Sequence, residues 1–183
     1  MVSTDRRDAV ARRGPAGVTV AGVAGGVGAT TVARAIVGVD RGVFTGRPVD
    51  VLVCRATGDS LVRASRATHV LAAAGHRPVV AVTAADASGP SRPVTARLRL
   101  LEPHTSAVVV LPFVRRWREL AVPLDDVRDL LTRPLIELPR QLRRYATAAR
   151  ELRAAVSAPL PASTRRTAAP LARPVPTIGR TAR

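Results

Sequence analysis

Lysine and asparagine are absent from this chain of 183 residues, so all 29 of its basic side chains are arginines. Aromatic residues make up only 2%, so the core must consist mainly of Val, Leu and Ala, and no aromatic platform for stacking single-stranded nucleic acid is expected. The single cysteine, Cys54, excludes an intrachain disulfide and fits a reducing compartment. This composition is typical of a genome rich in G and C.

Acidic residues are also scarce, with 13 against 29 basic ones, and the formal net charge is +16. The excess charge has two interpretations. It indicates either a solvated surface shaped by biased composition or a partner of negative charge, such as nucleic acid or a membrane surface. Retention on DNA or anionic lipid that falls as salt rises would favour the second interpretation.

Long apolar runs are missing as well. The uncharged stretch 14–33 follows Arg12 and Arg13 and superficially resembles a secretory signal, but it is rich in glycine and contains no leucine. Such a stretch makes a poor apolar helix, and no other stretch is long and apolar enough to span a membrane. We therefore expect a cytoplasmic protein.

Apolar runs and turn residues alternate along the middle of the chain. They predict buried strands at 18–23, 49–54, 79–83 and 107–111. Between and after these strands, helices are expected at 30–39, 59–74, 94–101 and 125–131, with Asp59 or Ser60 as a cap for the second. A longer last helix is expected from Leu135 or Pro139 to Val156. Residues 41–48 are expected to form a loop. The alternation predicts an α/β fold, a small parallel sheet with helices on both faces.

The length suits one domain with its own core. We place this domain at 16–156, after a flexible arm at 1–15. The segment 157–183 consists largely of Pro, Ala, Arg and Thr without any acidic residue, which predicts a disordered basic tail.

The last predicted helix has one apolar stripe, because its apolar residues recur in steps of three and four. They are Leu135, Leu138, Leu142, Tyr145, Ala149, Leu152 and Val156. The arginines lie mostly off this stripe. The pattern favours a helix docked on the sheet, while a dimer interface or a basic amphipathic membrane contact stays open.

A glycine-rich loop lies between the first predicted strand and the first predicted helix. A phosphate-binding loop needs backbone N–H groups that converge on the anion, and glycines allow the required backbone angles. This context predicts phosphate binding by Gly25, Gly26, Val27, Gly28, Ala29, Thr30 and Thr31.

The segment AGGVGATT at 24–31 resembles the deviant phosphate loop KGGxGK[ST][ST] of the ParA/MinD family of P-loop ATPases. Segments 50–71 and 107–120 resemble later strands of that family more weakly. The resemblance implies a P-loop fold, ATP and Mg²⁺ as ligands, and Thr30 as the residue that holds Mg²⁺. It also implies a homodimer that positions cargo on DNA or a membrane. Too few residues separate Val39 from Val49 for the family's next strand and acidic loop.

Both lysines of the family's loop are replaced, by Ala24 and Ala29. Losing one charged hydrogen bond of about 1.5–3 kcal/mol would weaken nucleotide binding by about 10- to 100-fold. Losing a positioned electrostatic donor commonly slows a reaction by about 10²–10³. We therefore expect a protein that binds a nucleotide weakly, without efficient hydrolysis, and acts by association with a protein partner, DNA or a membrane.

Charged residues are expected at the carboxyl ends of the strands, where ligands bind in open α/β sheets. They are Arg55, Asp86, Arg115 and Arg116. Arg55 could supply the charge that Ala29 lacks, and Asp86 could serve as the acid near Mg²⁺. Asp50 lies at the opposite end of its strand.

Other interpretations of the same residues stay open. The spacing GxxxGxG at 22–28, with Arg55 after the second strand, also fits a dinucleotide fold that binds NADP, although the Tyr-xxx-Lys pair of short-chain dehydrogenases is absent. Alternatively the loop is a structural turn, and the chain is a non-enzymatic basic module that binds nucleic acid or a partner protein. Trp117 is expected to pack under the last helix, and Cys54 is expected in the core.

Overall fold

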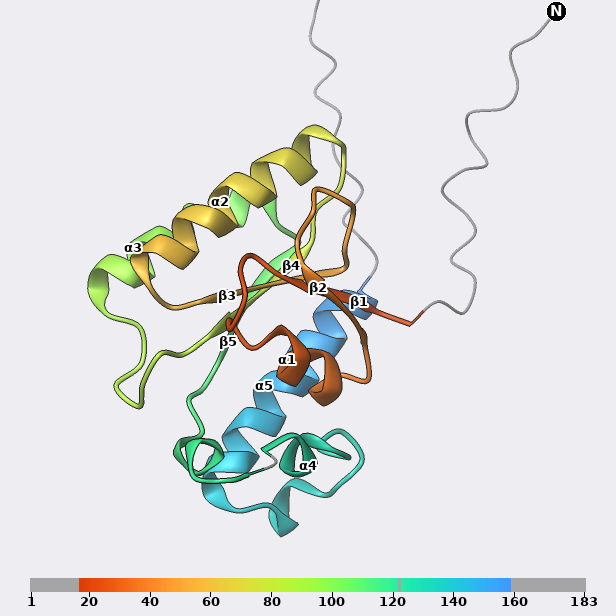
Figure 1. Cartoon of the computed structure of the whole chain (residues 1–183), viewed down its shortest axis with the longest axis vertical. Helices are drawn as coiled ribbons and strands as arrows, with labels where there is room; N and C mark the ends of the chain where they lie inside the picture. The colour runs from red at the N-terminus through yellow and green to blue at the C-terminus, as the bar shows by residue number, and fades with distance from the viewer. Residues whose placement is uncertain (1–16, 122, 159–183) are drawn as a thin grey trace, which may run out of the picture.

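In the computed structural model, which describes residues 17–121 and 123–158, five parallel strands form one sheet in the order β2-β1-β3-β4-β5 (Figure 1). The strands are β1 (Thr19–Gly22), β2 (Val39–Val43), β3 (Val51–Arg55), β4 (Val79–Thr83) and β5 (Ala107–Leu111). The predicted α/β class with a parallel sheet is confirmed, because four of these strands lie on the predicted apolar runs.

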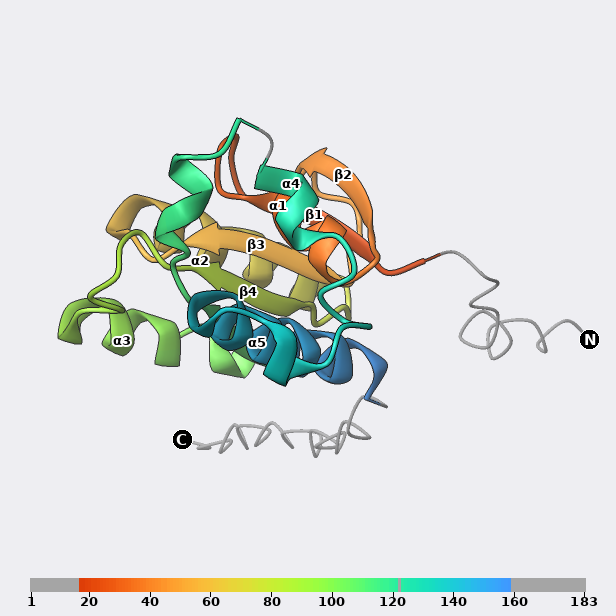
Figure 2. The same cartoon turned by 90° about the horizontal axis from the view of Figure 1, so that it is seen from below.

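Helices cover both faces of the sheet (Figure 2). One face carries α1 (Ala29–Ala35), α4 (Pro123–Val127) and α5 (Arg140–Ser157), and the other carries α2 (Gly58–Ala73) and α3 (Arg92–Arg99). Short 3₁₀ helices occur at η2 (Glu102–His104), η3 (Arg115–Arg118) and η4 (Leu135–Glu137). The core therefore consists of two apolar layers, and the central strands β3 and β4 are buried on both sides.

The second strand differs from the prediction. The expected helix 30–39 ends at Ala35, and part of the expected loop 41–48 belongs to β2. A strand is therefore present where too few residues were expected for an intervening strand and an acidic loop. Val37 has a positive φ of 54°, and the Gly38 N–H donates to Ala33 O at 2.7 Å, which ends the helix early. The sequence did not indicate β2 because this edge strand is exposed along its whole length.

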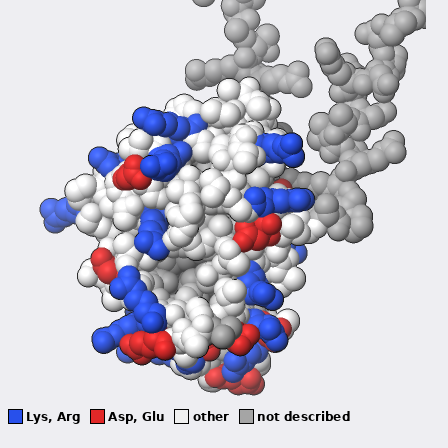
Figure 3. Space-filling model, viewed as in Figure 1, with Lys and Arg blue, Asp and Glu red and all other residues white. Residues whose placement is uncertain are grey.

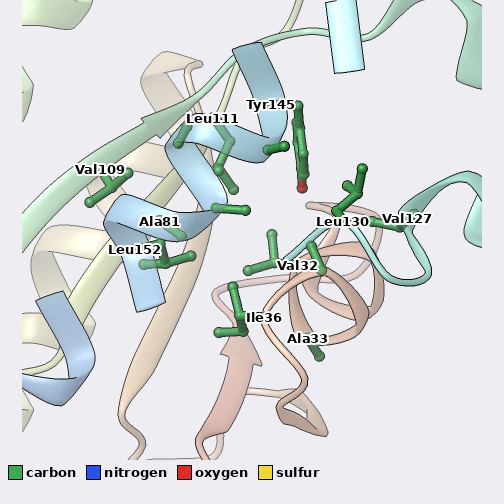
Figure 4. Packing of buried hydrophobic residues seen from close by; sticks show 14 of the residues in the cluster. Val32, Ala33, Ile36, Ala81, Val109, Leu111, Val127, Leu130, Tyr145 and Leu152 are labelled. Atoms are coloured by element: carbon green, nitrogen blue, oxygen red, sulfur yellow. The ribbon is translucent and has the colours of Figure 1, made fainter. Parts of the chain in front are cut away.

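The apolar stripe of α5 packs on the sheet, so the interpretation as a docked terminal helix is confirmed. Leu142, Tyr145 and Leu152 are each no more than 3% exposed, and they share one cluster with residues of α1, β4 and β5. Figure 4 shows Tyr145 and Leu152 in this cluster beside Val32 of α1 and Ile36, which directly follows α1. The stripe is thus used within the fold.

Three arginines of α5 donate to backbone carbonyls of neighbouring segments. Arg143 Nη2 donates to Leu138 O at 3.3 Å, Arg150 Nη2 to Leu131 O at 3.3 Å, and Arg153 Nη1 to Ile36 O at 3.2 Å. These side chains satisfy carbonyls of the connecting segments, and this structural use accounts for part of the basic character of α5.

Other boundaries change only slightly. Thr57, rather than Asp59 or Ser60, precedes the first residue of α2, and the Ser60 hydroxyl instead accepts from the Arg55 backbone N–H at 2.8 Å. The expected tail 157–183 starts one residue too early, because Ser157 is the last residue of α5. The expected arm at 1–15 and residues 159–183 of the expected tail lie outside the described residues.

Candidate functional site

The glycine loop lies where the strand order changes direction. β1 is the second strand of the sheet in space, with β2 on one side and β3 on the other. In open α/β sheets, ligands bind beyond the carboxyl ends of the strands at such a switch point. The loop at 24–28 follows β1 directly and therefore occupies this position.

The conformation of the loop requires glycine and is fixed by a threonine. Gly28 has a φ of 91°, which is in the left-handed region that favours glycine. The Thr83 hydroxyl, at the end of β4, lies 2.9 Å from Val27 O and 3.2 Å from Cys54 O, in position to donate to either carbonyl. This hydroxyl connects the loop to β3 and β4 and holds it at the carboxyl ends of the strands.

Several N–H groups of the loop and of the first turn of α1 have no acceptor. Within the described chain, the amides at positions 28–31 donate to no other residue, and the first intrahelical bond runs from Val32 N to Gly28 O at 3.0 Å. The two threonines diverge: Thr31 lines the pocket described next, while the Thr30 hydroxyl donates to the Asp40 carboxylate at 2.6 Å.

A pocket of about 200 Å³ opens beside the glycine loop, and we call it the edge pocket. Its wall is formed by Gly26, Val27, Gly28, Thr31, Arg55, Thr83, Ala84, Ala85, Leu111, Pro112, Phe113, Val114, Trp117, Arg118 and Tyr145. Figure 3 shows a hollow near the middle of one face, with arginine side chains around it. The lining contains two arginines and no carboxylate, so it suits an anion.

The two arginines reach the edge pocket from different elements. Arg55 Nη2, at the end of β3, donates to Gly26 O at 2.7 Å, and the Arg118 guanidinium lies 4.8 Å from the centre of the Phe113 ring. Within the described chain, neither arginine forms an ion pair with a carboxylate. Both charges therefore remain available for an anionic ligand.

The other predicted charged residues occupy different places. Asp86 and Arg115 line an adjoining hollow of about 460 Å³, which shares Pro112 and Phe113 with the edge pocket. Arg116 forms an ion pair with Asp126 at 2.8 Å and does not line the edge pocket. The structure thus brings Arg55 to the glycine loop and separates it from Asp86 and Arg116.

Ten residues of the pocket wall were not predicted as site residues, and Trp117, Arg118 and Tyr145 are among them. The Trp117 and Tyr145 rings meet edge to face, with centroids 4.7 Å apart at 72°, so the predicted packing of Trp117 under the last helix is confirmed. Burial raises the pKa of Tyr145 above its ordinary value. The apolar stripe of α5 contains Tyr145, but nothing in that pattern distinguishes a pocket residue from a core residue.

The remaining candidate groups lie away from the pocket lining. Cys54 is fully buried in β3, as predicted, and burial raises the pKa of its thiol to about 12. Asp50 accepts from Thr19 N at 2.9 Å at the start of β3, opposite the glycine loop. In the described part of the chain, no group of three or more His, Cys, Asp or Glu side chains could hold a metal ion.

Comparisons with known proteins add no relative: no family model, no curated protein and no solved structure matches this chain. Among the described helices, none is both long and apolar enough to cross a membrane.

Proposed function

We propose that this chain binds the phosphate groups of a nucleotide in the edge pocket, and that it does not hydrolyse the nucleotide efficiently. One observation carries the proposal: the wall of this pocket combines the glycine loop with two arginines that have no described carboxylate partner, and it contains no acidic residue. Unpaired amides and guanidinium groups are the donors that phosphate oxygens prefer.

The resemblance to the ParA/MinD family supports ATP as the nucleotide. Ala29 occupies the position of the family's loop lysine, so charge for the phosphates has to come from Arg55 or Arg118. An arginine that contacts the phosphates of the bound nucleotide does not replace a lysine positioned to stabilise the phosphoryl group during its transfer. We therefore expect weak binding and slow turnover. We place this activity in the cytoplasm.

Mg²⁺ accompanies nucleotides in this family, and its fit can be judged from the residues present. Thr30 Oγ1 and the Asp40 carboxylate are 2.6 Å apart and exposed, and Mg²⁺ takes oxygen ligands of this type together with phosphate and water. However, Asp40 and Thr30 line a hollow outside the edge pocket, and Asp86 lines another, where its carboxylate accepts from Ser88 N at 2.7 Å. Neither carboxylate is therefore placed beside phosphates in the edge pocket, and the residues present do not fit Mg²⁺ there.

The strand order disfavours the dinucleotide interpretation. The classic dinucleotide-binding order places the third strand beyond the second, whereas β3 lies on the opposite side of β1 from β2. The chain also lacks any lysine for dehydrogenase chemistry.

The test is calorimetric titration of the purified chain with ATP and Mg²⁺, with ADP, GTP and NADPH alongside. The Gly28→Asp variant places a carboxylate in the phosphate loop and should abolish binding. Gly75→Asp is the matched control, because Gly75 also has a positive φ, of 76°, has no atom within 4 Å of an added Cβ, and follows α2 outside the pocket lining.

Saturable ATP binding that Gly28→Asp loses and Gly75→Asp keeps would support the proposal. Rapid Mg²⁺-dependent hydrolysis by the pure protein would contradict the inefficient turnover. No binding of any nucleotide by a folded chain would refute the nucleotide site.

A second function is favoured by the charge distribution. Residues 157–183 contain five arginines and no acidic residue, so the chain could act by binding nucleic acid or an anionic partner through this segment. Deleting 159–183 would then abolish retention on DNA or anionic vesicles, whereas Gly28→Asp would leave it unchanged. For the ParA/MinD-like function, which includes homodimerisation and an unknown protein partner, the loop variant should change self-association.

A further inference from the structure

Tyr145 occupies an unusual place for a tyrosine in the edge pocket. It is only 3% exposed, and its hydroxyl hydrogen-bonds to no residue of the described chain. The hydroxyl oxygen is not among the buried polar atoms closed off from solvent without a partner. Tyr145 is also one of the residues that line the edge pocket. In Figure 4 the ring extends from α5 toward the beginning of α1.

A buried hydroxyl without a partner is unfavourable, because it has lost its hydrogen bonds to bulk water. A phenylalanine would fill the same space in this apolar cluster without that cost. The unpaired hydroxyl therefore points to an acceptor on a ligand. The neighbouring Trp117 Nε1 also has no acceptor in the described chain, but it is closed off from solvent and cannot reach a ligand in the pocket.

The size of the pocket limits which part of a ligand reaches this hydroxyl. About 200 Å³ is less than the roughly 300–1,000 Å³ that encloses a drug-sized molecule, so a whole nucleotide does not fit inside. The adjoining hollow of about 460 Å³ shares Ala84, Pro112 and Phe113 with the edge pocket and offers room for the remainder. The phosphate end belongs in the edge pocket because the glycine loop forms part of its wall.

We propose that the Tyr145 hydroxyl donates a hydrogen bond to an oxygen of the ligand's phosphate end, supplying a donor that Ala29 cannot provide. This inference rests on the proposed function and names the recognised chemistry: a di- or triphosphate whose phosphate end is held by the glycine loop, Arg55 and Tyr145. The raised pKa of Tyr145 keeps the phenol protonated, and therefore a donor, throughout the physiological pH range. Inorganic pyrophosphate is the smallest probe of this class.

The experiment compares the wild-type chain with Tyr145→Phe in calorimetric titrations with pyrophosphate and with ATP. The variant keeps the ring that packs on Trp117 and removes only the hydroxyl. The matched control is Thr147→Ala, which removes a hydroxyl from the same helix that donates only to Arg143 O, at 3.0 Å. We expect Tyr145→Phe to weaken both ligands by about 10- to 100-fold, as for a hydrogen bond to a charged group, and Thr147→Ala to change neither.

The outcomes separate this inference from the proposed function. Equal affinity of Tyr145→Phe and wild type, within about twofold, overturns the role of Tyr145 and leaves the nucleotide site intact. Failure of the wild type to bind either ligand refutes the nucleotide site itself, and the inference with it. If Tyr145→Phe does not fold, the near-ultraviolet absorption of the wild-type chain tests the inference instead. Tyr145 is the only tyrosine, and saturating pyrophosphate should shift its near-ultraviolet absorption. An unchanged tyrosine spectrum would overturn the inference.

Discussion

Replacing Arg55 by alanine separates ligand binding from folding. The guanidinium is exposed and forms one hydrogen bond, from Nη2 to Gly26 O at 2.7 Å, so it stabilises the loop only slightly. A net contribution of about 0.5–1.5 kcal/mol is the upper range for such a bond, and exposure favours the lower end. We expect the midpoint of urea unfolding to move little.

The effect on phosphate binding should be much larger. Hydrogen bonds between a guanidinium and a phosphate are charge-assisted and contribute about 1.5–3 kcal/mol, which corresponds to about 10- to 100-fold in affinity. Arg118 also lines the pocket, so some affinity should remain in the variant. Arg55→Lys should give an intermediate value, because lysine keeps the charge and loses the planar fork.

Calorimetry with ATP and with pyrophosphate measures this loss. Arg77→Ala serves as the control, since Arg77 is exposed, precedes β4 at the opposite end of the sheet and changes the net charge by the same amount. If Arg55→Ala binds as tightly as Arg77→Ala, the assignment of Arg55 to the phosphate site is wrong. If both variants lose affinity equally, the effect arises from overall charge and not from the pocket.

Two further predictions concern the fold that holds the pocket. A Cβ at Gly22 would lie 2.7 Å from Val27 Cγ2, so Gly22→Ala should lower the free energy of unfolding by about 1–3 kcal/mol in urea titrations. Gly25→Ala, with no atom within 4 Å of the added carbon, should change it by less than about 0.5 kcal/mol, and equal losses would contradict the close packing of the loop. Burial raises the pKa of Cys54 to about 12, so a thiol reagent at pH 8 should react only as fast as the protein opens, and rapid stoichiometric labelling of the native chain would disprove this burial.

The parts of the fold that were predictable are those with continuous apolar runs. β4 and β5 begin and end at the predicted residues, 79–83 and 107–111, although only β4 is buried on both faces and β5, at the edge of the sheet, is partly exposed. β2 was missed for the opposite reason. Its side chains are exposed, and it is positioned by a hydrogen bond from Val39 N to Val18 O at 2.7 Å, which no local pattern encodes.

The site was predictable only at the ends of the strands. The glycine loop and Arg55 could be placed because the loop comes after β1 and Arg55 is the last residue of β3. Trp117 and Tyr145 reach the same pocket through the packing of α5, and their spacing is that of ordinary core residues. Asp40 next to Thr30 could not be inferred either, since their contact depends on the early end of α1.

The edge pocket takes its walls from distant parts of the chain, with Gly26 near one end of the described residues and Tyr145 near the other. During synthesis the glycine loop, β1 and β3 leave the ribosome long before α5 does. The pocket therefore acquires its last wall only when α5 has emerged and docked on the sheet. A chain that stalls or is cut before residue 140 would carry the complete glycine loop and yet have an open, incomplete pocket. Ligand capture thus becomes a property of the finished domain, and premature fragments should not compete for the ligand.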